Sequence, residues 1–203
     1  MTDAAIVLAY LVGSIPTGLW LGMALRGVDI RKHGSHNIGA TNTMRVLGKK
    51  LGALALVGDA GKGLLAVLVI APLSPWAYAP LACGLAAILG HTASIFLKFR
   101  GGKGVATSAG VFLALTPIPM LIGVVVFGTV VAATRMVSAG SMLAALVMTV
   151  VVYALPFAWS VYPTQALPEV WSLRIVVTLV AALVVFRHRS NLRRILRGEE
   201  NKI

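Results

Sequence analysis

A basic, glycine-rich segment at residues 98–107 is the part of this chain best suited to bind an anion. It reads KFRGGKGVAT and leads directly into an apolar run. Glycines allow backbone N–H groups to converge on a phosphate, a following helix adds a partial positive charge, and Lys103 adds a full one. It is not a Walker A loop, because position 97 is Leu and Gly104 follows the lysine. The alternative interpretation is a tight basic hairpin at the lipid headgroups.

A second polar segment, residues 29–45, has the composition of a phosphate-binding loop. It reads DIRKHGSHNIGATNTMR, with glycines, small hydroxyl and amide side chains, and arginines. Freed backbone N–H groups, neutral donors and arginine forks all suit a phosphate. An ordinary solvated loop ending in a helix N-cap at Thr41 or Asn42 is the alternative.

The basic tail offers a third candidate group. His188 and Asn191 are spaced i, i+3, so a continuing helix would present both on one face. The histidine could act as a base or donate to a phosphate, and the asparagine could donate to a phosphate or hydroxyl. A juxtamembrane lipid anchor is the alternative for such a run of charges.

A few polar side chains fall inside or beside the apolar runs. Asp59 and Lys62 are i, i+3, and charges within a membrane face the interior in pairs, so they could simply neutralise each other. His91 lies near the end of another run. Ser138 and Ser141 follow a basic residue and could cap the first turn of a helix.

The sequence offers little for metal or thiol chemistry. Its six acidic residues form no cluster that would hold Mg²⁺ or Zn²⁺, and no Gly-x-Ser-x-Gly elbow occurs. The single cysteine, Cys83, lies inside an apolar run, so we expect neither a disulfide nor a thiolate metal site. We therefore predict metal-independent chemistry without a cofactor.

The distribution of charge predicts a polytopic membrane protein. Hydrophobic residues make up 58% of the chain and charged residues 12%, against about 25% charged in soluble domains. Of the 18 Lys and Arg, all except Lys62 and Arg174 fall within residues 26–50, 98–103, 135 and 187–202. Basic loops stay in the cytoplasm, which places Ser35, Lys103 and His188 there. The net charge of +12 then indicates anionic lipid or a polyanionic substrate rather than nucleic acid.

Seven apolar spans are predicted, in one all-α domain covering residues 1–203. A crossing helix needs roughly 17–25 residues, and only the fourth span is clearly too short. The N-terminus lies outside and the C-terminus in the cytoplasm; merging the fourth and fifth spans would put the basic tail outside. Small residues would pack the bundle, and Trp76, Trp159 and Trp171 would mark its outer end. The spans are 4–25, 51–71, 77–97, 104–116, 118–134, 137–157 and 170–187.

Eight blocks with matching motifs lie along the chain, at residues 13–18, 35–42 with Arg45, 59–63, 90–91, 101–107, 135–141, 187–191 and 198–201. Together these blocks resemble those of the bacterial acyl-phosphate:glycerol-3-phosphate acyltransferase family (PlsY type). Two positions depart from the family pattern. His36 replaces the usual glycine, so position 36 need not be a positive-φ site, and Ser94 lies where a proline is usual, which puts a proline kink there in doubt.

The resemblance implies transfer of an acyl chain from acyl phosphate to the sn-1 hydroxyl of glycerol 3-phosphate, giving lysophosphatidate. Acyl-CoA and acyl carrier protein would be inert, and either His188 or a substrate phosphate would accept the proton. It implies catalytic roles for Ser35, Arg45, Lys103, His188 and Asn191. It implies substrate binding by Asn37, Thr41, Asn42, Gly101, Gly102, Gly104, Thr107 and Ser141. It implies supporting roles for Asp59, Lys62, His91, Arg135 and Glu200.

The expected setting is the bacterial inner membrane, with the active site facing the cytoplasm. The partners would be glycerol 3-phosphate, acyl phosphate and membrane lipid. A transporter of phosphate esters is an alternative, but the outer connections are nearly bare of charge and no repeat is present. A lipid-anchored scaffold is another, but it leaves the glycine-rich segment unexplained.

Overall fold

The computed structural model describes residues 2–155 and 170–203, and every regular element within them is helical. The predicted outer connection 156–168, with Trp159, and the end of the predicted span 137–157 lie outside this range. The chain forms two compact units, Met1–Ala114 and Leu115–Ile203, each described below by itself.

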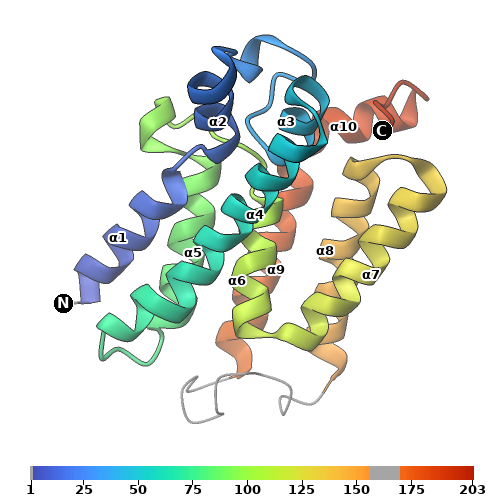
Figure 1. Cartoon of the computed structure of the whole chain (residues 1–203). Helices are drawn as coiled ribbons and strands as arrows, with labels where there is room; N and C mark the ends of the chain where they lie inside the picture. The colour runs from blue at the N-terminus through green and yellow to red at the C-terminus, as the bar shows by residue number, and fades with distance from the viewer. Residues whose placement is uncertain (1, 156–169) are drawn as a thin grey trace. The chain divides into compact units, whose positions relative to one another are not determined.

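The first unit is built around α1 and α5, which run side by side (Figure 1). Small residues allow this close approach: a Cβ added to Gly13 would lie 2.2 Å from the Ala87 carbonyl oxygen, and one added to Gly90 would lie 2.3 Å from the Tyr10 carbonyl oxygen. The expected small-residue packing is therefore present. The elements are α1 (Thr2–Ser14), α2 (Thr17–Arg26), η1 (Ile30–Lys32), α3 (Ala40–Leu47), α4 (Lys49–Leu65), η2 (Ala66–Ile70), η3 (Ala71–Leu73), α5 (Ala79–Thr92), η4 (Ile95–Leu97) and α6 (Val105–Leu115).

The first predicted span, 4–25, is not one straight helix. It breaks after Ser14, and α1 and α2 meet at 46°. Pro16 explains the break, because its ring has no N–H to donate to the preceding turn. At the break the Ser14 carbonyl accepts a hydrogen bond from Ser94 Oγ (2.6 Å). The Ile15 carbonyl accepts from the Thr17 N–H (3.1 Å) and from Lys62 Nζ (2.8 Å). Pro16 is therefore the sequence signal for this bend. The prediction of one continuous span over residues 4–25 did not include it.

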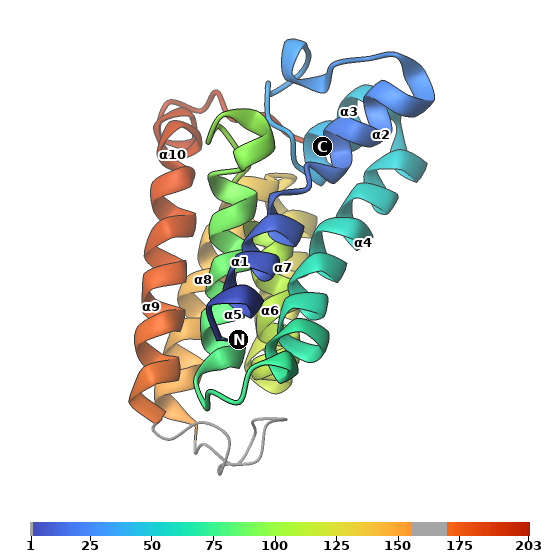
Figure 2. The same ribbon diagram turned by 90° about the vertical axis from the view of Figure 1, so that its left-hand side faces the viewer.

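The second unit is a helical bundle in which α8 packs on both α7 and α9. Buried residues of α9 recur at helical spacing, as at Leu173, Val177 and Val184. A short helix, α10, leaves the end of α9 at 57°, visible in Figure 2. The elements are α7 (Pro117–Thr134), α8 (Val137–Ala154), α9 (Val170–Arg187) and α10 (Arg189–Leu196).

Length and composition support fewer crossings than the seven predicted. Among the described residues four helices are long and apolar enough to span a membrane, or up to six if each bent pair counts as one span. The short apolar helix α6 has only 11 residues. The chain is thus an all-helical protein with several membrane-spanning helices.

Position 36 does have the glycine-like conformation that the sequence interpretation regarded as unnecessary. His36 has φ +56°, and its Nδ1 lies 2.9 Å from the Arg31 carbonyl oxygen. Histidine is one of the few L residues enriched in this region. At the other departure no proline is needed, because Ser94 is buried and its hydroxyl holds the turn.

We predict that His36→Gly is tolerated and His36→Ile is not. Glycine removes the backbone strain at position 36, which stabilises the folded protein. It also removes the exposed hydrogen bond of the imidazole and raises the conformational entropy of the unfolded chain. These effects oppose each other, so the free energy of unfolding should change by less than about 1 kcal/mol. A β-branched residue should lower it by about 1–2 kcal/mol. Thermal unfolding in detergent measures both, and equal stability of the two variants would contradict the assigned conformation.

Candidate functional site

The glycine loop, residues 98–104, is fastened to the end of α5. The Gly101 N–H donates to the Thr92 carbonyl (3.2 Å) and the Gly102 N–H to the His91 carbonyl (3.0 Å). A Cβ on Gly101 would lie 2.0 Å from the His91 carbonyl oxygen, so no larger residue fits there. Gly104, with φ +83°, then turns the chain into α6. The loop thus brings its backbone, and Lys103, to a helix N-terminus.

The first turn of α6 contains two buried hydroxyl groups. Thr107 is fully buried and Ser108 nearly so, and neither hydroxyl has a hydrogen-bond partner among the described residues. Buried polar atoms normally have partners, so an unpartnered pair in one turn is a feature that a ligand can explain. The first N–H groups of a helix also lack partners within the helix. This end of α6 therefore offers several polar groups to an anion.

Asn42 organises the polar loop between α2 and α3, residues 27–39. This loop comes before the glycine loop in the chain and is called the first polar loop below. Its Oδ1 accepts from the Ser35 N–H (2.8 Å), and its Nδ2 lies 2.9 Å from the Ile30 carbonyl oxygen and 2.8 Å from that of Asn37. Asn42 is buried and holds the loop together. Helix α3 begins at Ala40 with Gly39 as its N-cap, so the alternative interpretation, with an N-cap at Thr41 or Asn42, does not hold for the cap. Ser35 and Arg45 remain exposed, and Thr41 is half-buried.

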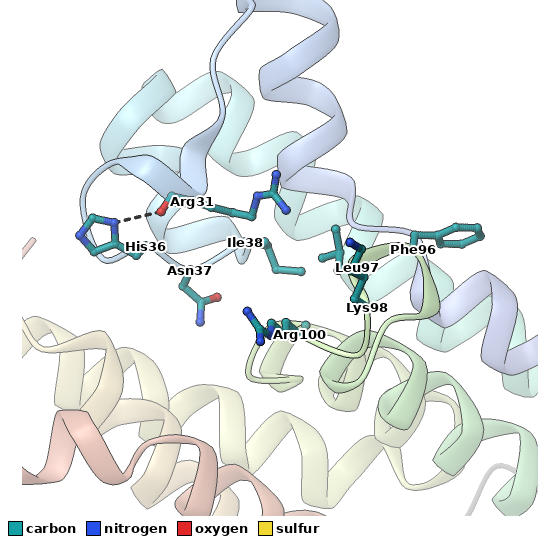
Figure 3. Close-up of a pocket in the computed structure, with 9 residues that line it drawn as sticks. Arg31, His36, Asn37, Ile38, Phe96, Leu97, Lys98 and Arg100 are labelled. Carbon is teal, nitrogen blue, oxygen red and sulfur yellow. Dashed lines mark hydrogen bonds between the residues drawn. The ribbon is translucent and has the colours of Figure 1, made fainter.

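A cavity of about 700 Å³ lies between the first polar loop and the glycine loop (Figure 3). Of the residues expected to bind substrate it includes Asn37 and Gly101. It also includes three cations that the sequence interpretation left out of the site, Arg31, Lys98 and Arg100. The lining residues are Arg31, His36, Asn37, Ile38, Phe96, Leu97, Lys98, Arg100 and Gly101.

The charge of Arg31 is already matched by a neighbour. Its Nε and terminal nitrogen bind the Asp29 carboxylate at 2.9 and 2.7 Å, and these hydrogen bonds lower the pKa of Asp29 to about 2. Asp29 is therefore ionised at neutral pH and occupies the Arg31 fork. Lys98 and Arg100 are the cavity cations left to attract a phosphate.

The intramembrane ion pair predicted on α4 is present. Asp59 Oδ1 lies 2.9 Å from Lys62 Nζ, and both side chains are buried. His91 joins them from α5, with its Nδ1 2.8 Å from Lys62 Nζ. These three expected supporting residues therefore form one cluster.

In the second unit His188 is buried at the junction of α9 and α10. Its Nδ1 lies 2.8 Å from the Val184 carbonyl oxygen. A carbonyl only accepts, so Nδ1 carries the proton and Nε2 is the acceptor nitrogen of the neutral ring. This is the tautomer that a base acting through Nε2 requires.

Asn191 is fixed by a buried carboxylate in the tail. Glu200 accepts from Asn191 Nδ2 (2.6 Å), Ser138 Oγ (2.8 Å) and Arg194 Nε (2.9 Å). Burial alone would raise the pKa of Glu200, but these hydrogen bonds outweigh it and hold the pKa below its ordinary value. Glu200 is thus ionised at neutral pH and fixes the orientation of the Asn191 amide.

The two serines near the start of α8 make different contacts. Met136 is the N-cap of α8, so neither serine caps it, and Ser141 Oγ donates to the Val137 carbonyl of its own helix (2.8 Å). Ser138 contacts Glu200 instead, across 62 positions of sequence, which no local pattern could have signalled. Arg135 holds the chain end, with its Nε 2.6 Å from the Ile203 carbonyl oxygen.

Comparison with known proteins gives consistent matches over nearly the whole chain. A family model described as glycerol-3-phosphate acyltransferase matches residues 4–198. The glycerol-3-phosphate acyltransferase of Geobacter sulfurreducens is 48% identical over 198 residues, covering 96% of this chain and 93% of that protein. The corresponding protein of Trichlorobacter lovleyi is 46% identical over 200 residues, with the same coverage of 96% and 93%.

Two solved structures share the fold. Both are crystal structures of PlsY (YgiH), an integral membrane glycerol 3-phosphate acyltransferase. The glycerol 3-phosphate form superposes with a TM-score of 0.86 at 33% identity, and the lysophosphatidic acid form with 0.83 at 32%. Each comparison covers 100% of this chain and 95% of that one. The family match, the identities and the shared fold agree, and the protein belongs to the PlsY-type glycerol-3-phosphate acyltransferase family of integral membrane proteins.

Proposed function

We propose that the protein transfers an acyl chain from acyl phosphate to the sn-1 hydroxyl of glycerol 3-phosphate, giving lysophosphatidate and inorganic phosphate. The observation that carries this proposal is the match to PlsY in two forms, one with glycerol 3-phosphate and one with lysophosphatidic acid. These two molecules are the acceptor and the product of such an acylation.

The reaction needs no strong acid and no metal ion. Acyl phosphate is a mixed anhydride, so phosphate is already a good leaving group. The glycerol hydroxyl oxygen attacks the acyl carbon, the bond from that carbon to the phosphate oxygen breaks, and the hydroxyl proton passes to a phosphate oxygen or to His188 Nε2. Binding of both substrates supplies proximity, and fixed cations stabilise the charge that moves.

The glycine loop and the first turn of α6 are the proposed site for the phosphate of acyl phosphate. Lys103 and the N-terminus of α6 both favour negative charge. The buried, unpartnered hydroxyls of Thr107 and Ser108 support a polar ligand at this turn. The cavity beside the loop, with Lys98 and Arg100 in its wall, is a route by which an anion can be attracted.

The remaining proposed roles follow the family resemblance. Ser35 and Arg45, exposed on and after the first polar loop, would bind a substrate phosphate. In the second unit His188 and Asn191 would bind and orient substrate. The Nδ1–H tautomer of His188 and the carboxylate that holds Asn191 support these roles, since each fixes one orientation.

The proposed topology has seven crossings, with the N-terminus outside and the C-terminus in the cytoplasm of a bacterial inner membrane. It counts the two bent pairs and the short α6 as crossings, which keeps every strongly basic segment on the cytoplasmic side. The active-site loops would then face the soluble acceptor, while the acyl chain and the product stay in the bilayer.

The first prediction concerns the donor. Purified protein in lipid should form lysophosphatidate from glycerol 3-phosphate and acyl phosphate, but not from acyl-CoA or acyl carrier protein, because the loop offers a site for a bare phosphate only. Turnover should survive a strong chelator. Comparable rates with acyl-CoA, or loss on chelation that Mg²⁺ restores, would contradict the proposed mechanism. Radiolabelled glycerol 3-phosphate entering sealed vesicles without a lipid product would favour the transporter.

The second prediction concerns Lys103. Removing a charged donor from a transition-state site costs roughly 3–4 kcal/mol, so Lys103→Met should lower kcat about 10²–10³-fold without unfolding the protein. Lys103→Arg should also be poor, because a planar fork replaces a compact ammonium in a tight turn.

Lys202→Met is the matched control, since Lys202 is exposed near the chain end. The sequence alone would also suggest Lys98→Met as a control. Lys98 lines the cavity, so this substitution is unsuitable as a control. If Lys103→Met keeps most of its activity, the glycine loop is only a turn.

The third prediction concerns topology. In a Cys83→Ala background, Ser35→Cys should react with an impermeant thiol reagent only after the cytoplasmic side is opened. Trp76→Cys, on the connection before α5, should react in intact cells; both positions are exposed. Labelling of position 35 from outside intact cells would reverse the proposed orientation.

A further inference from the structure

A buried cluster of three ionisable side chains lies next to the glycine loop. Asp59, Lys62 and His91 are 1%, 6% and 4% exposed and come from α4 and α5. An ion pair that served only to neutralise itself would not need a histidine. The contacts of the Lys62 ammonium show what the histidine adds.

Lys62 has three acceptors within reach. Its Nζ donates to the Ile15 carbonyl at 2.8 Å and lies 2.8 Å from His91 Nδ1. Asp59 Oδ1, at 2.9 Å, balances the charge as an ion pair without the angles of a hydrogen bond. An ammonium group only donates, so the lone pair of His91 Nδ1 must accept, and the ring proton is on Nε2.

The opposite edge of the His91 ring faces the glycine loop. A Cβ added to Gly102 would lie 2.3 Å from His91 Nε2, so the backbone of Gly102 approaches this nitrogen closely. The Gly102 N–H also donates to the His91 backbone carbonyl. His91 therefore contacts Lys62 on one side and the anion-binding loop on the other.

We propose that His91 is a positioning residue for the glycine loop, fixed by Lys62 and Asp59 as the Nε2–H tautomer. In this tautomer the N–H lies on the edge of the ring next to Gly102, and the ring holds the loop in the conformation that brings Lys103 to the N-terminus of α6. This proposal rests on the proposed function of the glycine loop. The cluster thereby links the break between α1 and α2, through the Ile15 carbonyl, to the phosphate site.

The tautomer can be measured without any assay of activity. The full chain, labelled with ¹⁵N-histidine and placed in lipid nanodiscs, contains His33, His36, His91 and His188. Loss of a signal in His91→Gln assigns His91. We expect a protonated Nε2 and an unprotonated Nδ1. His188 is the internal control, because the Val184 carbonyl requires the reverse pattern there. A proton on Nδ1 of His91 would overturn the proposal, whatever reaction the protein catalyses.

Two substitutions separate positioning from simple packing. His91→Asn places an amide oxygen near Nδ1 to accept from Lys62 but cannot reach the loop, whereas His91→Gln can place an amide N–H near the Nε2 position. Because misplacing a binding group by about 1 Å can cost 10²-fold, we expect His91→Asn to lower kcat/KM about 10²-fold, mainly by raising KM for acyl phosphate. His91→Gln should recover part of that loss, and the thermal midpoint of His91→Asn should stay near that of the wild type.

The outcomes are distinct. Wild-type kinetics in His91→Asn would overturn the proposal. An equal loss of kcat/KM in both variants, together with an equal drop in thermal midpoint, would also overturn it, because it would mean that the ring only fills space. If the wild-type protein forms no lysophosphatidate while the tautomer is as expected, the proposed function fails and the assigned histidine geometry stands.

Discussion

The first unit depends on satisfying the backbone where its first apolar helix breaks inside the protein. Pro16 interrupts the helical hydrogen bonds, so the Ser14 and Ile15 carbonyls lose their i+4 partners. Carbonyl groups without partners cost several kcal/mol in a membrane, so side chains must reach them. Ser94 and Lys62 do so, and the choice of a lysine has consequences. A charge at the centre of a spanning helix costs about 2.5–3.5 kcal/mol on insertion scales, which explains why Asp59 lies one turn earlier on the same helix.

Glycine is the second constraint, because it lets the chain approach this cluster closely. Gly101 lies against the end of α5 and Gly102 against the His91 ring, where side chains would collide. Their N–H groups donate to the Thr92 and His91 carbonyls, and this close packing brings Lys103 to the N-terminus of α6, where an anion is favoured. For this reason a glycine substitution alone cannot separate structure from function in this loop, whereas substitutions of Lys103 and His91 can.

Local features of the sequence were sufficient for most of the helices and for part of the site. Apolar runs marked the spanning helices, and the i, i+3 spacing of Asp59 and Lys62 gave their ion pair. Pro16 is the sequence signal for the bend within the first span. Contacts between distant segments left no signal: nothing near Ser138 indicates that it binds Glu200, and nothing near Lys98 indicates that it shares a cavity with Asn37. The φ of His36 was similarly hidden, because a histidine does not require the conformation that it adopts there.

The two buried histidines show why residue type alone underdetermines chemistry. His91 faces an ammonium group through Nδ1, so its ring presents a donor on the other side. His188 faces a carbonyl group through Nδ1, so its ring presents an acceptor. Two identical side chains thereby present a donor nitrogen in one case and an acceptor nitrogen in the other, as the proposed loop-positioning and base roles require. The two partners have different origins. The Val184 carbonyl lies four residues earlier on the same helix as His188. Lys62 lies 29 residues before His91 in the sequence and reaches it from another helix, α4. A histidine motif in a membrane protein therefore acquires its role from what its Nδ1 contacts, and that contact depends on helix packing as much as on the motif.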